Sequence, residues 1–133
     1  SELHQDALDT YVMNRGHEPV ADRANQVNDI LDLTQDDDHL TAVSKRLTSS
    51  YGPIDLVVGG PPCQGYSGIG HRRSFDITKE QIPSNHLYRE MARLVQVVAP
   101  RAFVFENVRG LLNSRWTPAG DKGEIWADVQ KAF

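Results

Sequence analysis

Two short runs of apolar residues, each followed by a polar or glycine-rich turn, are typical of buried β-strands. The first run covers residues 54–58 and the second covers residues 102–105. Between them, residues 85–98 carry apolar side chains at helical spacing, and Pro100 blocks continuation of that helix; its apolar positions are Leu87, Met91, Leu94, Val95 and Val98. A strand, a helix and a second strand in this order favour an α/β fold with a mostly parallel sheet.

Helical spacing predicts further helices on both sides of these elements. Residues 3–14 form one apolar stripe, made of Leu3, Ala7, Leu8, Tyr11 and Val12. A second helix follows the three aspartates at 36–38, which we interpret as a negatively charged helix cap rather than a metal site. Residues 108–113 and 123–133 predict two shorter helices, and the polar, glycine-rich residues 65–84 predict a long loop.

Composition narrows the class of protein. A chain of 133 residues with 39% apolar and 24% charged residues is typical of one soluble globular domain. The single cysteine excludes a disulfide framework and the multi-cysteine zinc sites, and the five histidines lack paired metal-ligand spacing. No apolar run approaches the ~20 residues of a membrane span. We therefore expect a cytoplasmic (bacterial, nucleoid-associated) or nuclear protein with no metal and no membrane contact.

Charge is distributed unevenly along the chain. The net charge of −4 argues mildly against nucleic acid as a partner. Residues 1–62 hold 11 acidic and 4 basic side chains, whereas residues 63–133 hold 7 acidic and 10 basic ones. The basic half begins at the cysteine, so this half is the better candidate for contact with an anionic partner.

The cysteine occupies a stiff corner after the first predicted strand. Gly59 and Gly60 end the strand, Pro61 and Pro62 stiffen the turn, and Cys63 follows them. A structural cysteine would more often lie within an apolar run. In α/β folds, ligands and catalytic groups gather at the carboxyl ends of the strands, so we expect Cys63 to be chemically active.

Two motifs resemble those of the DNA (cytosine-5) methyltransferases. Residues 60–67, Gly-Pro-Pro-Cys-Gln-Gly-Tyr-Ser, resemble the family's Pro-Cys-Gln loop, and residues 105–109, Phe-Glu-Asn-Val-Arg, resemble its Glu-Asn-Val motif. Their order and separation also match the family. The resemblance implies a Rossmann-like, doubly wound, mostly parallel sheet with helices on both faces. It covers only the central part of a catalytic domain, so residues 1–133 are expected to be an incomplete domain without its first strand, target-recognition domain and C-terminal motifs.

The resemblance implies a covalent reaction on cytosine. The ring's carbon 5 becomes nucleophilic once a thiolate adds at carbon 6, and Cys63 is the chain's only thiol. Glu106 is the candidate acid at ring nitrogen 3, where charge must be relieved. Asn107 is expected to orient the two loops, and the Pro61–Pro62 backbone to read the base's exocyclic amine. The methyl donor would be S-adenosyl-L-methionine.

Candidate cofactor-binding residues follow from the same resemblance. Glu2, with Leu3 beside it, would bond the ribose hydroxyls, because a carboxylate accepts two bonds from a vicinal diol. A solvated glutamate near the end of the chain explains Glu2 equally well. Asp29, followed by Ile30, would accept from the adenine amino group, whereas an Asn-Asp turn also forms without any ligand. Pro61 and Leu87 would line the cofactor, and core packing explains Leu87 equally well. We expect Glu2, Asp29, Cys63 and Glu106 to share the carboxyl edge of the sheet.

The partner implied by the resemblance is double-stranded DNA with its target cytosine flipped out of the helix. The glycine-rich stretch after Cys63 would close over it, with Arg72 and Arg73 on phosphates and an apolar wedge, Ile69, in the vacated space. A simple loop contact explains Ile69 equally well. The other implied DNA-contacting residues are Gln64 and Ser67.

Other cysteine chemistries fit the sequence less well. A phosphatase loop needs arginine where Ile69 stands, a dithiol site needs a second cysteine, and a protease needs a positioned histidine. A different class of function stays open: an inactive fragment, or a subunit that binds DNA or a partner and completes a site in trans. Exposed apolar faces would then lead to self-association or to pairing with a complementing chain.

Overall fold

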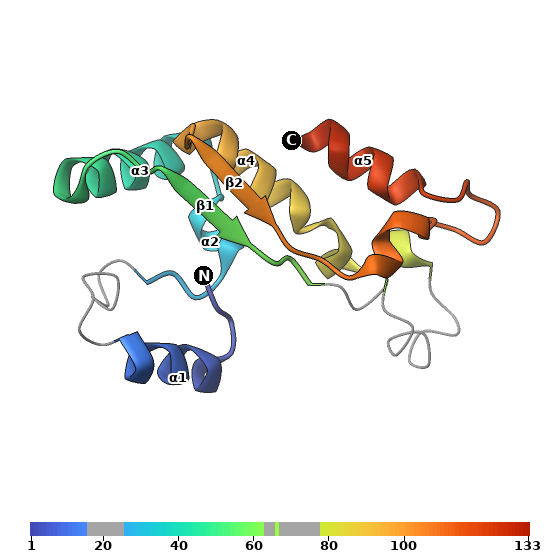
Figure 1. Cartoon of the computed structure of the whole chain (residues 1–133), viewed down its shortest axis with the longest axis horizontal. Helices are drawn as coiled ribbons and strands as arrows, with labels where there is room; N and C mark the ends of the chain where they lie inside the picture. The colour runs from blue at the N-terminus through green and yellow to red at the C-terminus, as the bar shows by residue number, and fades with distance from the viewer. Residues whose placement is uncertain (16–25, 63–65, 67–77) are drawn as a thin grey trace. The chain divides into compact units, whose positions relative to one another are not determined.

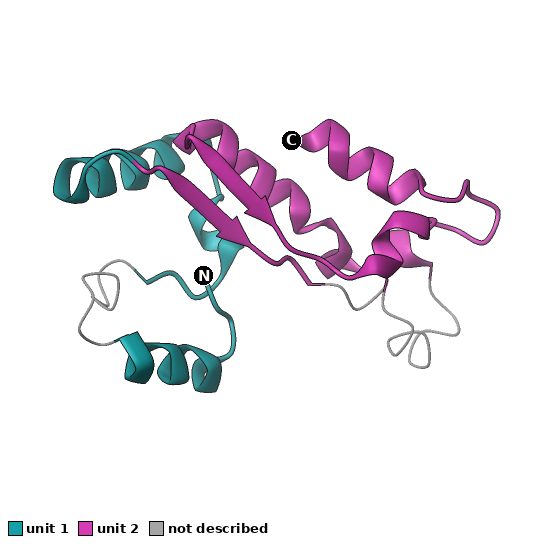
Figure 2. Ribbon diagram, viewed as in Figure 1, with its two compact units in different colours: residues 1–53 teal, residues 54–133 magenta. Residues whose placement is uncertain are grey.

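The computed structural model describes residues 1–15, 26–62, 66 and 78–133 (Figure 1). The chain divides into two units, residues 1–53 and residues 54–133 (Figure 2). The described residues of the first unit form helices and no strand, and the two described strands belong to the second unit. Each unit is described separately below.

Unit 1 contains the helices α1 (Gln5–Arg15), α2 (Ile30–Leu33) and α3 (Asp37–Tyr51). The aspartate cap predicted for α3 is confirmed, because the Asp36 carboxylate accepts a hydrogen bond from the His39 backbone N–H at 2.6 Å. Helix α1 forms as predicted, but none of its residues is buried, and Tyr11 is 47% exposed. Of its apolar stripe, Leu8 and Val12 are half-buried, so α1 packs only loosely among the described residues.

Unit 2 is built on two parallel strands, β1 (Leu56–Gly59) and β2 (Ala102–Phe105), paired in the register Leu56 to Ala102. Helix α4 (Tyr88–Val98) connects them and ends before Pro100, as predicted. Its predicted start at residue 85 is wrong, because residues 83–86 form a 3₁₀ turn opened by Pro83. The alternation of strand and helix confirms the α/β pattern, with a sheet of two described strands.

Helices cover one face of this sheet. Cross-strand partners point to the same face, and the register places Gly59 and Phe105 together. Met91 of α4 lies against Gly59, where a Cβ would stand 2.6 Å from its sulfur. Helix α5 (Glu124–Ala132) is followed by Phe133, which covers the same face of the sheet. The Phe133 ring contacts the Phe105 ring edge-on, with 5.4 Å between the ring centroids.

The opposite face of the sheet is exposed. Leu56, Val58 and Val104 share it by register, and they are 52%, 65% and 48% exposed. The prediction that both strands are buried is therefore wrong for this face. Parallel strands normally have both faces covered, and among the described residues helices cover only one.

The core of unit 2 lies beyond the ends of the strands, where residues from several elements meet. Its buried members are Tyr66, Tyr88, Leu111, Ile125 and Val129. Leu111 belongs to a 3₁₀ helix, η6 (Arg109–Asn113), and the last two to α5, which confirms both predicted helical segments. The predicted loop over residues 65–84 is wrong in part: η4 (Lys79–Gln81) and η5 (Pro83–His86) are helical, and Tyr66 is in the core.

Candidate active site

The two turns that carry the sequence motifs lie side by side. Gly60 follows β1 directly and Glu106 follows β2 directly. The Glu106 backbone N–H donates to the Gly59 carbonyl at 2.9 Å, which extends the ladder of the sheet by one bond. Because parallel strands end at the same edge, both turns occupy the carboxyl edge of the sheet, where α/β folds place their sites.

The Glu106 carboxylate lies over the turn that leads to Cys63. A Cβ at Gly60 would stand 3.0 Å from Glu106 Oε2, so the absence of a side chain at Gly60 makes room for the carboxylate. Glu106 is exposed. The exposed carboxylate of Glu106 is thus available to a ligand, and it lies against Gly60, three residues before Cys63 in the sequence.

Asn107 joins the same two turns. Its side-chain amide donates to the Pro61 carbonyl at 3.1 Å, and its amide oxygen accepts from the Val108 backbone N–H at 2.9 Å. Both ends of this half-buried amide are therefore used, and the chain two residues before Cys63 is tied to the turn after β2. The Pro61 carbonyl keeps a second lone pair for another donor.

Tyr66 is a residue that the sequence analysis missed. Its ring is 6% exposed, and its hydroxyl donates to the Asn85 carbonyl at 2.6 Å. Burial, reinforced by Tyr88 and opposed by Arg89, raises the pKa of the Tyr66 hydroxyl well above its usual range. The available signal was a large aromatic residue in a mostly polar, glycine-rich stretch. Tyr66 thus connects the residues after Cys63 with those before α4.

Leu87 stands at the start of α4, where it is half-buried. Its neighbour Asn85 is 1% exposed, and the Asn85 amide donates to the Lys79 carbonyl at 2.8 Å. Burial lowers the pKa of Lys79, whose ammonium donates to the Ser114 hydroxyl at 3.2 Å. These contacts fix the backbone around Leu87 and leave both of its interpretations, cofactor contact and core packing, open.

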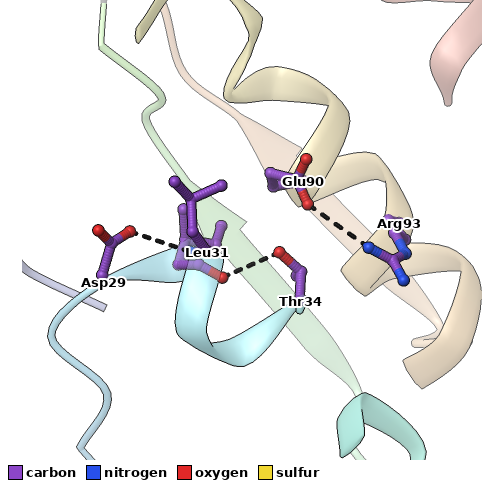
Figure 3. Close-up of polar contacts among 6 residues, drawn as sticks. Asp29, Leu31, Thr34, Glu90 and Arg93 are labelled. Carbon is purple, nitrogen blue, oxygen red and sulfur yellow. Dashed lines mark hydrogen bonds and ion pairs between the residues drawn. The ribbon is translucent and has the colours of Figure 1, made fainter. Parts of the chain in front are cut away.

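Unit 1 carries the other candidate cofactor residues. Asp29 caps α2, because its Oδ1 accepts from the Leu31 backbone N–H at 2.9 Å (Figure 3). Glu2 Oε1 accepts from the His4 backbone N–H, also at 2.9 Å. Next to these carboxylates, Leu3 is 68% exposed and Ile30 is half-buried. The contact of Asp29 is the one that an Asn-Asp turn makes without a ligand.

The remaining candidates lie outside the described residues. They are Cys63, Gln64, Ser67, Ile69, Arg72 and Arg73. Within the described ranges, the histidine, cysteine, aspartate and glutamate side chains form no group of three or more able to hold a metal ion. The described part of the chain also contains no helix with the length and apolar character needed to cross a bilayer.

Parallel strands that deliver a Pro-Pro-Cys turn and a Glu-Asn-Val turn to one edge point to the DNA methylases as a class. The family model of the C-5 cytosine-specific DNA methylases matches residues 1–122. The match covers most of the 133 residues, and the chain belongs to this family. No solved structure gives a significant match.

Curated relatives are bacterial and phage methyltransferases. The Type II methyltransferase M1.HphI of Haemophilus parahaemolyticus is 35% identical over 104 residues, 77% of this chain and 24% of the relative. M.Bpa9945I of Bacillus paralicheniformis is 36% identical over 80 residues, 60% of this chain and 16% of the relative. The orphan methyltransferase M.SPRI of Bacillus phage SPR is 36% identical over 91 residues, which are 68% of this chain and 18% of the relative. The chain thus spans less than a quarter of the length of these relatives.

Proposed function

We propose that this chain forms the nucleophile-bearing part of a DNA cytosine-5 methyltransferase with a Rossmann-like, doubly wound sheet. The observation that carries the proposal is the junction of the two motif turns. The Glu106 carboxylate lies against Gly60, and Asn107 bonds the Pro61 carbonyl at 3.1 Å. An acid and a cysteine-bearing turn at one sheet edge suit nucleophilic addition to a ring that must be protonated at the same time.

The residues of the chain act in a defined order in this reaction. The Cys63 thiolate forms a bond to carbon 6 of a flipped-out cytosine, while Glu106 holds a proton at ring nitrogen 3. The electron pair of the carbon 5–carbon 6 double bond then becomes available at carbon 5. S-adenosyl-L-methionine would supply the electrophilic methyl group, and its sulfur would keep the bonding pair as a neutral thioether. Water acting as a base then takes the proton from carbon 5, and the freed electron pair re-forms the double bond as the carbon 6–sulfur bond breaks and releases the Cys63 thiolate.

The carboxylates of unit 1 suit the cofactor that this reaction needs. Asp29 and Glu2 each use one oxygen to accept a backbone N–H. An ionised carboxylate has two oxygens and about four acceptor sites, so each retains capacity for a further donor. Asp29 would take the adenine amino group and Glu2 the ribose hydroxyls, with the apolar Leu3, Ile30, Pro61 and Leu87 beside the cofactor.

Double-stranded DNA is the proposed partner. Arg72 and Arg73 would contact phosphates, and Ile69, Gln64 and Ser67 the bases around the flipped cytosine. These residues follow Cys63 in the half of the chain with 10 basic and 7 acidic side chains. The excess of positive charge after the nucleophile is consistent with a polyanionic partner.

Trapping on 5-fluorocytosine tests this proposal. Fluorine at carbon 5 does not leave as a proton does, so the methylated adduct should stay bonded to Cys63. Two proteins are incubated with S-adenosyl-L-methionine and duplex DNA of mixed sequence that contains 5-fluorocytosine. One is this chain alone, and the other is a chimera in which this chain replaces the matching residues of M1.HphI. We expect an adduct in the chimera and none after Cys63→Ser. No adduct from the unsubstituted chimera on any duplex would contradict the proposed reaction.

A second candidate function is a subunit that is completed by another chain. The observation favouring it is the exposed sheet face, where Leu56, Val58 and Val104 are about half exposed or more. Apolar side chains on one face of a parallel sheet are normally covered by helices. An adduct that appears only when the remaining part of the M1.HphI chain is added as a separate polypeptide would support this function.

Val58 offers a test of that exposed face. Val58 is 65% exposed in this chain, so Val58→Asp should change its free energy of unfolding by less than ~0.5 kcal/mol. If further elements cover the face in the chimera, the same substitution buries a charge there and should cost several kcal/mol. Urea denaturation of both proteins measures the difference, with Leu112→Asp, 48% exposed but on η6, as control. Equal effects in both proteins would show that the face stays uncovered.

A further inference from the structure

Tyr66 is buried although its sequence neighbours are polar. Its ring, 6% exposed, packs in the core with Tyr88, Leu111, Ile125 and Val129. Its hydroxyl donates to the Asn85 carbonyl at 2.6 Å, and the raised pKa keeps this hydroxyl protonated as a donor. The chain is therefore anchored three residues after Cys63.

The backbone of Tyr66 is held as well. A Cβ at Gly110 would stand 3.2 Å from the carbonyl carbon of Tyr66 and closer still to its oxygen. Gly110 lies in η6, four residues after Glu106, and its own carbonyl accepts from the Ser114 hydroxyl at 2.8 Å. The obstacle to a side chain at Gly110 is a rigid backbone group, so any larger residue there must displace Tyr66.

Both ends of the segment around Cys63 are thus attached to one stretch of chain. Asn107 bonds Pro61, two residues before Cys63, and Gly110 packs against Tyr66, three residues after it. The stretch that provides both attachments, residues 107–110, directly follows Glu106.

We propose that Tyr66 is a positioning residue that, with Gly110, anchors the chain three residues after Cys63 to the stretch that follows Glu106. The inference rests on the proposed function, in which thiol and acid act on opposite sides of one ring. Asn107 and Gly110 fix the two ends of the segment, and the Tyr66 hydroxyl fixes it to Asn85, two residues before Leu87. One anchor therefore relates the nucleophile to both the acid and the cofactor side. A displacement of about 1 Å in such an arrangement can slow a reaction by about 100-fold.

Limited proteolysis of the 133-residue chain tests the anchor without any assumption about activity. Chymotrypsin cuts after accessible Tyr and Phe, and both Tyr66 and Tyr88 are buried in this chain. In Gly110→Ala, cleavage after residue 66 should rise about tenfold or more, while cleavage after Tyr88 should stay within about twofold. Tyr66→Phe, which keeps the ring and loses the hydroxyl, should show a smaller rise. Leu112→Ala, an exposed change in the same η6, is the control.

Two results of the proteolysis experiment would contradict the proposal that Gly110 anchors the chain at Tyr66. One is unchanged cleavage after residue 66 in Gly110→Ala. The other is an equal rise after residues 66 and 88 in both variants, which would indicate a general loss of structure in place of a released segment.

The rate of adduct formation in the M1.HphI chimera tests whether the anchor at Tyr66 and Gly110 affects the reaction. Gly110→Ala should lower this rate by about 100-fold and Tyr66→Phe by less than about tenfold, with the DNA dissociation constant unchanged within about twofold in both. An unsubstituted chimera that forms the adduct, with Gly110→Ala equally fast, would overturn the positioning role and leave the proposed function intact. An unsubstituted chimera without any adduct would instead overturn the proposed function, and the proteolysis result would still decide the anchor.

Discussion

Replacing Glu106 by glutamine is expected to slow methyl transfer by about 100- to 10,000-fold, the usual contribution of a positioned general acid. Glutamine has nearly the shape of glutamate and can still form hydrogen bonds, but it has no proton to give to ring nitrogen 3. Because Glu106 lies over Gly60 without a bond that glutamine would break among the described residues, the fold should be retained. The loss should therefore appear in the chemical step and leave DNA binding unchanged.

Single-turnover transfer of a labelled methyl group in the chimera measures this loss, with DNA affinity determined separately. Glu80→Gln is a matched control, because Glu80 is also exposed and lies in η4, outside the two turns that follow the strands. The control should keep its rate within about twofold. A Glu106→Gln variant that works within tenfold of the unsubstituted protein would remove Glu106 from the mechanism and leave Cys63 without its acid.

The strands and helices were predictable because their apolar residues follow a regular period. Residues 102–105 form β2 with the predicted bounds, and α4 ends before Pro100 as expected. The start of α4 was placed three residues early, since the apolar spacing of Leu87 and Met91 continues into the 3₁₀ turn. Periodicity reports which residues share a face, and it does not distinguish an α-helix from a 3₁₀ turn at its end.

Burial was predicted less well than secondary structure. The apolar runs predicted buried strands, yet Leu56, Val58 and Val104 are exposed. Burial depends on what covers a face, and the covering elements are set by long-range packing that a local pattern does not contain. The same reason explains Tyr66, whose polar neighbours predicted a loop and whose contacts lie 19 residues away at Asn85 and further on at Gly110.

The chemistry assigned to the candidate site stays a prediction, and the sequence predicted only part of its geometry. The motifs identified Glu106 and Asn107, and the structure brings them to the turn that precedes Cys63. The sequence did not indicate that Gly60 and Gly110 are required by close approach of other groups, since a glycine in a turn has many causes. The roles assigned to Glu2 and Asp29 stay predictions, because both carboxylates also satisfy nearby backbone donors in unit 1.

Leu111→Ala should lower the free energy of unfolding by about 2–5 kcal/mol, the usual cost of removing a buried leucine side chain. Leu111 is 2% exposed and packs in the core that also holds Tyr66. Its neighbour Leu112 is 48% exposed in the same η6, so Leu112→Ala should cost less than about 1 kcal/mol. Trp116 and Trp126 pack against this core, and their fluorescence during urea denaturation measures both variants.

Leu111→Ala and Gly110→Ala together distinguish a weakened core from a released anchor at Tyr66. Leu111→Ala weakens the packing of Tyr66 and Tyr88 together, so chymotrypsin should cut after both residues faster, whereas Gly110→Ala should release Tyr66 alone. Equal stability losses in Leu111→Ala and Leu112→Ala would show that the core does not limit unfolding. The anchor of the Cys63 segment would then depend on the Asn85 and Gly110 contacts without support from the packed ring.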